Sequence, residues 1–473
     1  MKISRTTVAL AGVALAAHST PSLSQQAGTQ VPEVHPALPS KVCTMVTNVL
    51  AKVGQADQVD QVDQVAQVDT KAGVSTCVTE KSSVVIDANW RRINAVGTTK
   101  ACFEDNKWDT TTCSTPKECA EICSLEGADY AGNHSITTEG NELSMKLETP
   151  GGVGTRVYML DASGTKYKQF QLLNQEFTFD VDMSTLPCGS NGALYFSKMD
   201  PDGGTARFPV NTAGAAYGTG YCDAQCQKDI RFINGEGNLN NTYGSCCTEM
   251  DIWESNSMAT AYTTHPCSTD GQQRCLDSKD CGDTDETRYT GWCDKPGCDF
   301  NPFRLGNKKF YGPGKQFEID STRPFTVITQ FVTDDNTEKG ELVEIRRLYK
   351  QDDRLIKNPG STWPTLDKTD SITDTMCNSS KAYFDEEPYV MGGLAQLGQQ
   401  MVGGMTLAMS IWVDYGSNMT WLDSYTGDDP TAPGALRGGC PNPGGDPESV
   451  FAESPDATVK FMNIRSGDFG STY

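Results

Sequence analysis

The chain has 473 residues and a formal net charge of −22. This length suffices for one large domain or for about three domains of average size. The excess of acidic residues argues against a nucleic-acid partner, because phosphates require a basic surface.

Residues 1–24 have the pattern of a secretory signal peptide. Lys2 and Arg5 form a basic start, an apolar run follows from Val8 to Ala17, and small residues come next. The run is too short to span a bilayer and no later stretch is long enough, so we expect a secreted, extracellular protein without a membrane partner. A mitochondrial address is the less favoured alternative, because the basic region is short.

The chain contains eighteen cysteines, all of which follow this segment. An even count in a secreted chain indicates disulfides, nine if all of the cysteines pair. A zinc site is disfavoured, because histidines are few and the cysteines at 222, 226, 246 and 247 do not form two regular ligand pairs. We therefore expect no metal and no cofactor.

A triplet repeat of the type Gln-Val-Asp occupies residues 58–69, between Cys43 and Cys77. A period of three matches neither strand nor helix, so the repeat predicts a solvated, disordered loop at about 55–70. Four sequons mark candidate glycosylation sites on surface loops, at Asn133, Asn240, Asn378 and Asn418.

Beyond the repeat, hydrophobic residues alternate with polar ones as in β-strands. The alternating positions begin at Phe177, Phe325 and Met405, and turn-forming Gly, Pro, Asn and Asp residues separate the runs. This pattern predicts an all-β protein, a curved antiparallel β-sandwich with long loops.

Three carboxylates crowd into six residues, at Glu249, Asp251 and Glu254, among the apolar residues Met250, Ile252 and Trp253. Crowded acids repel one another unless they share a task, and cleavage of a glycosidic bond requires two carboxylates with different pKa values. Glu249 and Asp251 share one face of a strand, whereas Glu254 joins them only if the strand is bulged or strongly curved. The alternative is an exposed acidic strand edge.

Tryptophans beside polar residues are candidate platforms for sugar rings, whose apolar C–H faces lie on flat aromatic groups. Trp412 falls on the polar face of the run that begins at Met405, and Trp90 and Trp421 also have polar neighbours. Core packing is the alternative for each of them.

The motifs together resemble those of glycoside hydrolase family 7, the fungal-type cellulases. The resemblance covers residues 44–473, with the triplet repeat as an insertion, and rests on Val85-Ile-Asp87-Ala-Asn-Trp90, Asn191-Gly-Ala-Leu-Tyr195, Tyr221-Cys-Asp223-Ala-Gln225, Cys246-Cys247-x-Glu249-Met-Asp251-Ile-x-Glu254, His265-Pro-Cys267 and Tyr311-Gly-Pro-Gly314. It implies a jelly roll with a cleft or partial tunnel, retaining chemistry and a β-1,4-glucan substrate. Without the other motifs, the acidic triplet also fits the β-1,3-glucanases of family 16.

The resemblance assigns a role to each site residue. Glu249 would be the nucleophile and Glu254 the acid/base, while Asp251 would tune the nucleophile. Asn191, Tyr195, Asp223 and Gln225 would surround the reacting sugars, and His265 would lie near the acid/base. The sugar platforms would be Trp90, Trp412 and Trp421, and the product side would be lined by Arg288, Arg304 and Arg437.

The resemblance also implies nine cysteine pairs. These are Cys43–Cys77, Cys102–Cys123, Cys113–Cys119, Cys188–Cys440, Cys222–Cys247, Cys226–Cys246, Cys267–Cys293, Cys275–Cys281 and Cys298–Cys377. A further cysteine pair of many relatives is replaced here by Gly28 and Ser124. We expect an N-terminal segment at 25–82 and a single catalytic domain at 83–473, with no separate carbohydrate-binding module.

Other departures bear on the mode of action. Arg92 replaces a tryptophan of the tunnel entrance, the loop from Phe232 to Cys246 is short, and Lys295-Pro296 replaces an acidic position of the product site. The segments that carry Arg288 and Arg437 keep the length found in cellobiohydrolases. We therefore expect a monomeric enzyme that binds cellulose and mainly releases cellobiose. The alternatives are an endo-β-1,4-glucanase and, less favoured, a β-1,3-glucanase or a non-catalytic jelly-roll lectin.

Overall fold

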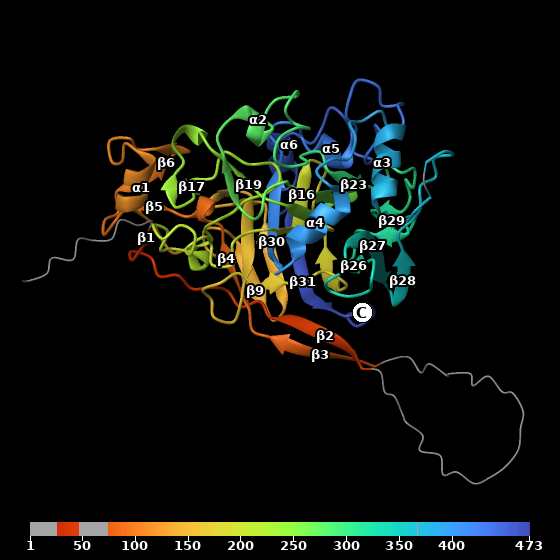
Figure 1. The fold of residues 1–473 in the computed structure, drawn as a ribbon, viewed down its shortest axis with the longest axis horizontal. Coiled ribbons are helices and arrows are strands. Elements are labelled where there is room, and N and C mark those ends of the chain that lie inside the picture. Colours follow the sequence, from red (N-terminus) through yellow and green to blue (C-terminus); the bar gives the residue numbers. More distant parts are fainter. Residues whose placement is uncertain (1–25, 47–73, 367) are drawn as a thin grey trace, which may run out of the picture.

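The computed structural model describes residues 26–46, 74–366 and 368–473. The expected signal peptide and the triplet repeat lie outside these residues. Two large β-sheets stack face to face, and long loops with short helices gather at the upper edge in Figure 1. The predicted all-β sandwich is therefore confirmed.

The first large sheet supports the functional site. Its eight strands follow the order β23 (Cys298–Phe300), β21 (Thr260–His265), β20 (Glu249–Ser255), β16 (Ser190–Ser197), β30 (Met405–Val413), β13 (Thr155–Leu160) and β4 (Ser83–Ile86), with β14 (Gln169–Phe170) also on β30. The described pairs in this sheet are all antiparallel.

The second large sheet has ten strands and packs behind the first. Its main order is β28 (Arg354–Lys357), β27 (Leu342–Gln351), β26 (Phe325–Thr333), β15 (Glu176–Asp182), β31 (Thr458–Gly467), β10 (Glu142–Lys146) and β9 (Ile136–Glu139), with β2 (Ser40–Val46), β3 (Val74–Glu80) and β29 (Ser371–Ile372) at its margins. Strand β2 joins β31 in parallel, so the N-terminal segment is part of this sheet.

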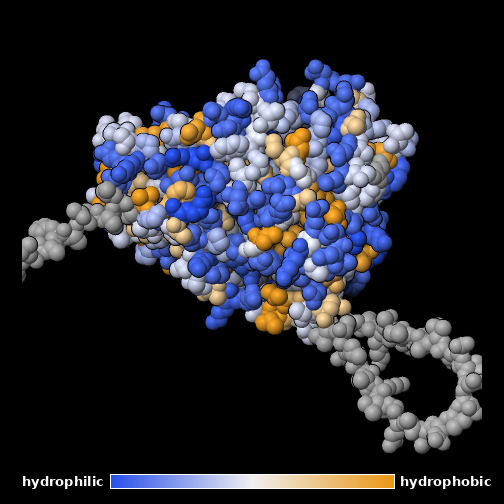
Figure 2. Space-filling model, viewed as in Figure 1, coloured by the Kyte–Doolittle hydropathy of each residue, from blue (hydrophilic) through white to orange (hydrophobic). Residues whose placement is uncertain are grey.

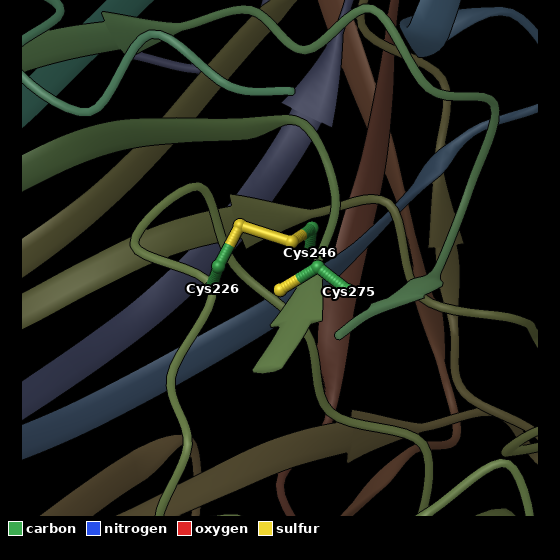
Figure 3. A group of neighbouring side chains, drawn as sticks. All are labelled: Cys226, Cys246 and Cys275. Atoms are coloured by element: carbon green, nitrogen blue, oxygen red, sulfur yellow. A yellow bond between two sulfur atoms is a disulfide. The ribbon is translucent and has the colours of Figure 1, made fainter. Parts of the chain in front are cut away.

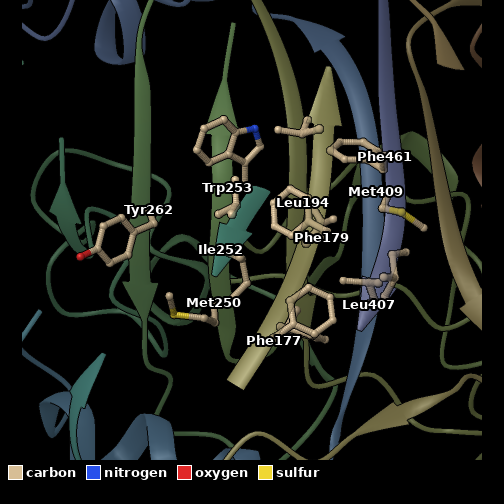
Figure 4. Packing of buried hydrophobic residues seen from close by; sticks show 14 of the residues in the cluster. Phe177, Phe179, Leu194, Met250, Ile252, Trp253, Tyr262, Leu407, Met409 and Phe461 are labelled. Atoms are coloured by element: carbon tan, nitrogen blue, oxygen red, sulfur yellow. The ribbon is translucent and has the colours of Figure 1, made fainter. Parts of the chain in front are cut away.

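The hydrophobic core fills the space between the two sheets. Phe177 and Phe179 of β15 face Leu194 of β16 and Leu407 and Met409 of β30, as Figure 4 shows, and all five are fully buried. The alternating runs read from the sequence therefore place their apolar residues inward. The polar residues of β30 on the other face, such as Ser410, face a cavity instead.

Smaller elements brace the loops around this core. A five-stranded sheet contains β1 (Gln26–Ala27), β8 (Cys123–Leu125), β5 (Ile93–Ala95), β6 (Ala101–Glu104) and β7 (Lys107–Trp108). The helices are α1 (Pro116–Ile122), α2 (Ser278–Cys281), α3 (Asp374–Tyr383), α4 (Gly393–Met401), α5 (Thr420–Asp423) and α6 (Pro447–Glu453). Several begin at a capping side chain, for example at Thr115, Thr373 and Asp446, whose oxygens accept from backbone amides.

All nine predicted disulfides are present, and they involve all eighteen cysteines. Figure 3 shows the bond between Cys226 and Cys246, with Cys275 beside it. These three sulfurs lie within 4.8 Å of one another. They provide no free thiolate for a metal, because Cys275 is bonded to Cys281.

The buried carboxylate of Glu126 lies beside Gly28 and Ser124, the two positions that replace the further cysteine pair. Strand β1 runs beside β8, and the Glu126 carboxylate accepts hydrogen bonds from the amides of Gln30 and Val31 and from the Ser124 hydroxyl. A Cβ atom at Gly28 would lie only 2.3 Å from this carboxylate. The glycine therefore leaves room for a polar contact that holds the N-terminal strand.

The visible face of the molecule is mainly hydrophilic, with scattered hydrophobic residues (Figure 2). Within the described residues, helices with the length and apolarity needed to cross a membrane are absent. Among the four sequons, Asn240 and Asn378 are exposed, and Asn133 and Asn418 are half-buried. Whether these asparagines carry glycan stays a prediction.

Candidate active site

A cavity of about 780 Å³ lies against the outer face of the eight-stranded sheet. Strands β13, β16, β20, β21 and β30 supply its floor, and loops supply its walls. Every site residue proposed from the sequence lines this cavity except Asn191 and Arg304.

Strand β20 brings the three carboxylates to the cavity by means of the predicted bulge. Its register against β21 shifts between Asp251 and Glu254, so that Ile252 and Trp253 together oppose Tyr262. All three of these apolar residues lie in the core. Because two consecutive residues turn inward, Glu254 returns to the face that carries Glu249 and Asp251.

Each of the two glutamates has a fixed hydrogen-bond donor. The amide of Ala224 donates to Glu249 Oε2 at 3.0 Å, and Asn191 Nδ2 donates to Glu254 Oε1 at 3.0 Å. Asn191 is fully buried, and its Oδ1 accepts from the Ser255 amide. Asn191 therefore lies behind Glu254, which it orients.

The environment raises the pKa of both glutamates. Burial raises the pKa of Glu249 well above its usual range, and the charges of Asp251 and Asp223 act in the same direction. Burial and Asp251 raise the pKa of Glu254 to about 8, although His265 and Asn191 oppose them. The cluster therefore retains a proton at neutral pH, which a general acid requires.

His265 is paired with the middle carboxylate. Its Nε2 lies 3.1 Å from Asp251 Oδ2, and its Nδ1 lies 2.8 Å from the carbonyl oxygen of Asp294. Burial lowers the pKa of His265, but the hydrogen bond and charge of Asp251 outweigh it and raise the pKa to about 9. Gly297 packs on the ring with a φ of +65°, where a Cβ atom would lie 2.5 Å from it.

A chain of hydroxyls and a carboxyl adjoins Glu249. Tyr195 and Tyr221 share a hydrogen bond of 3.0 Å, and the Tyr221 hydroxyl donates to Asp223 Oδ2 at 2.8 Å. Burial raises the pKa of Asp223 to about 6. Within the described part of the chain, its Oδ1 atom is buried without a side-chain hydrogen-bond partner.

Trp90 stands on a rigid polar support at one wall of the cavity. It ends a short 3₁₀ turn (Ala88–Trp90) that is capped by the Asp87 side chain. Asp87 also binds Arg156 at 2.7 Å, and the Arg156 guanidinium lies 3.2 Å from the centre of the Tyr221 ring. This network holds the turn that carries Trp90 at the cavity wall, and the role of Trp90 as a sugar platform stays a prediction.

Trp412 and Trp421 form a second aromatic surface. Their rings are stacked, with centres 6.1 Å apart and planes inclined by 27°. The Trp421 indole donates to Asp414 Oδ2 at 3.1 Å, which holds that ring in place. Both rings line the cavity and are partly exposed, so their faces remain available to a sugar ring.

The arginines expected on the product side take different positions. Arg288 and Arg437 line the cavity, and Arg437 contacts Asp299 and Glu386 at 3.3 Å each. Arg304 does not line it, in contrast to the expectation, because its guanidinium is buried against the same two acids. Arg304 thus acts as a support that fixes Asp299 and Glu386.

Sequence reasoning missed several residues of the cavity wall. Arg156 interrupts an otherwise apolar strand, a signal that could have marked it as functional. Lys381 and Glu386 do not belong to a recognisable motif. Both line the cavity, and Glu386 reaches it from a loop that is far from the acidic triplet in sequence. Asp299 directly follows Cys298 and carries a pKa of about 2, because the nearby Arg304 and Arg437 charges outweigh its burial.

The fold and the carboxylate cavity define a β-sandwich glycoside hydrolase, and comparisons with known proteins agree. The model of glycosyl hydrolase family 7 matches residues 27–473. The chain therefore belongs to glycosyl hydrolase family 7, a family of cellulases. Because it is an enzyme family, the lectin alternative is not retained.

Solved structures of both kinds of cellulase resemble the chain. A family 7 cellobiohydrolase from Daphnia pulex is 42% identical, with a TM-score of 0.86 over 95% of this chain and 100% of that one. A cellobiohydrolase from Melanocarpus albomyces complexed with cellotetraose is 39% identical, with a TM-score of 0.82 over 95% and 99%. The endocellulase EGI from Humicola insolens is 33% identical, with a TM-score of 0.75 over 95% and 100%.

Proposed function

We propose that this protein is a secreted retaining cellulase that cleaves β-1,4-glucosidic bonds and mainly releases cellobiose. The observation that carries the proposal is the set of three carboxylates on β20, which face one cavity with aromatic surfaces on its walls. Similarity to cellobiohydrolases that are 39% and 42% identical supports the product.

The two glutamates take the two roles of a double displacement. Glu249 attacks the anomeric carbon as the carboxylate, a form that the Ala224 amide favours against the burial and neighbouring acids that raise its pKa. Glu254 gives its proton to the leaving oxygen and then, as a base, takes a proton from the water that cleaves the glycosyl-enzyme bond. The raised pKa of Glu254, about 8, keeps this proton available.

The remaining polar residues position these groups and the sugar. Asp251 holds His265 and, through its charge, raises the pKa of both glutamates. Asp223 and Tyr195 border the Glu249 side of the cavity, and Gln225 joins Lys295 through a 2.9 Å hydrogen bond to its carbonyl oxygen. Trp90, Trp412 and Trp421 provide the sugar platforms, with Arg288 and Arg437 at the product side.

We expect His265→Gln to shift the alkaline limb of the pH profile of kcat/KM upward. A general acid must be protonated, so activity falls as the pH rises through the pKa of Glu254. The charge of His265 lowers that pKa, and His265 remains protonated in this range because its own pKa is about 9. Its removal should move the limb up by about one pH unit on an aryl cellobioside. A limb that stays in place or moves down would contradict this coupling.

Chain-end cleavage and internal cleavage both have support in the sequence. The segments with Arg288 and Arg437 favour the release of cellobiose from chain ends, whereas Arg92 and the short stretch at 232–246 favour an open cleft. We expect cellobiose as the main soluble product, together with some internal cleavage.

The test is the ratio of soluble to insoluble reducing ends formed on amorphous cellulose, measured together with viscosity loss on carboxymethylcellulose. A ratio well above one is the expected result. A ratio near one with rapid viscosity loss would identify an endoglucanase, and preference for laminarin over cellulose would identify a β-1,3-glucanase.

Secretion through residues 1–24, glycosylation and a monomeric state complete the proposal. The disulfide-braced fold supports an extracellular location, because disulfides persist in oxidising compartments.

A further inference from the structure

One wall of the cavity concentrates positive charge in a strongly acidic protein. Lys295 and Arg288 line it. Lys295 Nζ lies 3.5 Å from Asp283 Oδ1, and Asp283 Oδ2 lies 2.6 Å from Lys228 Nζ, although Asp283 and Lys228 are not among the residues that line the cavity. The charge of Arg288 also acts on Lys295. We call these four residues the cationic wall. It holds three cations and one carboxylate, although the chain as a whole carries a net charge of −22.

Lys295 is held beside the catalytic groups by its own backbone. Its carbonyl oxygen accepts from Gln225 Nε2 at 2.9 Å, and the carbonyl of the preceding Asp294 contacts His265 at 2.8 Å. Both Gln225 and His265 line the cavity, as does Lys295. The backbone of Lys295 is therefore fixed beside the catalytic groups, and its side chain is nearly buried at the cavity wall.

The positive charges of the cationic wall are poorly compensated. Lys295 is only 8% exposed, and its ammonium makes one long contact, to a carboxylate that Lys228 already binds more closely. Burial and the charge of Arg288 lower the pKa of Lys295, against the effects of Asp283 and of the more weakly acting Asp223. Within residues 26–46, 74–366 and 368–473, the Arg288 side chain makes no hydrogen bond or ion pair. An ammonium group has three protons to donate, so donors remain unused.

A neutral sugar does not require such a wall. Neutral rings bind through aromatic faces and ordinary hydrogen bonds, which Trp412, Trp421 and the polar floor already offer. A carboxylate, in contrast, gains charge-assisted hydrogen bonds from a lysine and an arginine. The other lysine and arginines of the cavity are already paired with acids, namely Arg156 with Asp87, Lys381 with Glu386, and Arg437 with Asp299 and Glu386. A carboxylate would therefore bind at the cationic wall.

We propose that the cationic wall is a product-side subsite for a carboxylate carried by a β-1,4-linked glucose unit. Lys295 and Arg288 bind the carboxylate, and the cellulase cleft binds the sugar. The inference rests on the proposed function for the sugar part of the ligand. The carboxylate can come from an oxidised chain end, at C1, or from a uronic acid unit, at C6.

The test compares three disaccharides by titration calorimetry at low salt: cellobiose, cellobionate with its carboxylate at C1, and glucosyl-β-1,4-glucuronic acid with its carboxylate at C6. We expect one of the acids to bind the wild-type protein about tenfold more tightly than cellobiose. The advantage should shrink in about 0.5 M salt, because salt screens charges. If cellobionate binds more tightly, the carboxylate comes from an oxidised chain end. If the glucuronic acid disaccharide does, it comes from a uronic acid unit.

Variants assign the effect to the cationic wall. Lys295→Met should abolish the advantage, Arg288→Gln should reduce it, and Lys295→Arg should retain it. Lys339→Met is the matched control, because Lys339 is exposed outside the cavity and the same charge is removed. The inference is overturned if neither acid binds the wild-type protein more tightly than cellobiose, or if Lys295→Met keeps the advantage while Lys295→Arg is folded and active.

Failure of the proposed function would look different. Wild-type protein that does not hydrolyse an aryl cellobioside or cellulose contradicts the cellulase assignment, whatever the affinities of the acids. An active cellulase with no preference for either acid contradicts the cationic wall alone.

Discussion

Glu249→Gln should lose at least about 10³-fold in turnover of an aryl cellobioside, the largest effect we expect from any single substitution. The amide has nearly the shape of the carboxylate but cannot form the glycosyl-enzyme bond, so the first step of the reaction is blocked. The loss should be similar for good and poor leaving groups, because both require the same nucleophile. Turnover is measured with dinitrophenyl and methylumbelliferyl cellobiosides.

Binding provides the internal control for Glu249→Gln. Cellobiose affinity should be retained, because the Trp412 and Trp421 platforms and Arg437 do not depend on the charge of Glu249. Glu341→Gln serves as the matched variant, since Glu341 is an exposed acid outside the cavity. Near wild-type turnover in Glu249→Gln would exclude it as the nucleophile.

Glu254→Gln should distinguish substrates by their leaving groups. Cellulose has a poor leaving group that needs a proton, so its hydrolysis should fall by about 10²–10⁴-fold. Dinitrophenolate leaves without protonation, and glycosyl-enzyme formation from a dinitrophenyl cellobioside should fall much less. Rapid-quench measurement of the initial burst separates this step from the later attack of water, which also uses Glu254.

The stereochemistry of the first product tests the same assignment. A retaining enzyme releases the β-anomer first, which proton NMR detects before mutarotation mixes the anomers. Equal losses on both substrates in the burst experiment would argue against Glu254 as the acid. An initial α-anomer would reject the double displacement as a whole.

Local sequence was sufficient to predict which side chains of the catalytic strand share one face. The spacing of Glu249 and Asp251 places both on one face of any strand, and the apolar residues at 252 and 253 required a bulge if Glu254 was to join them. Alternating runs at Phe177 and Met405 likewise predicted which residues enter the core. These features follow from a period of two, which a linear sequence displays directly. The disulfide pairs, in contrast, came from the family resemblance.

Only the tertiary structure decided which loops complete the cavity. The position of Arg304 behind Asp299 and Glu386, the support of Trp90 by Asp87 and Arg156, and the cationic wall all join residues from separate loops. Such contacts depend on how irregular segments pack over the sheet, and irregular segments have no periodicity that would reveal their partners. The sequence therefore determined the strand that carries the chemistry, whereas the packing of its loops determined the surroundings that tune it.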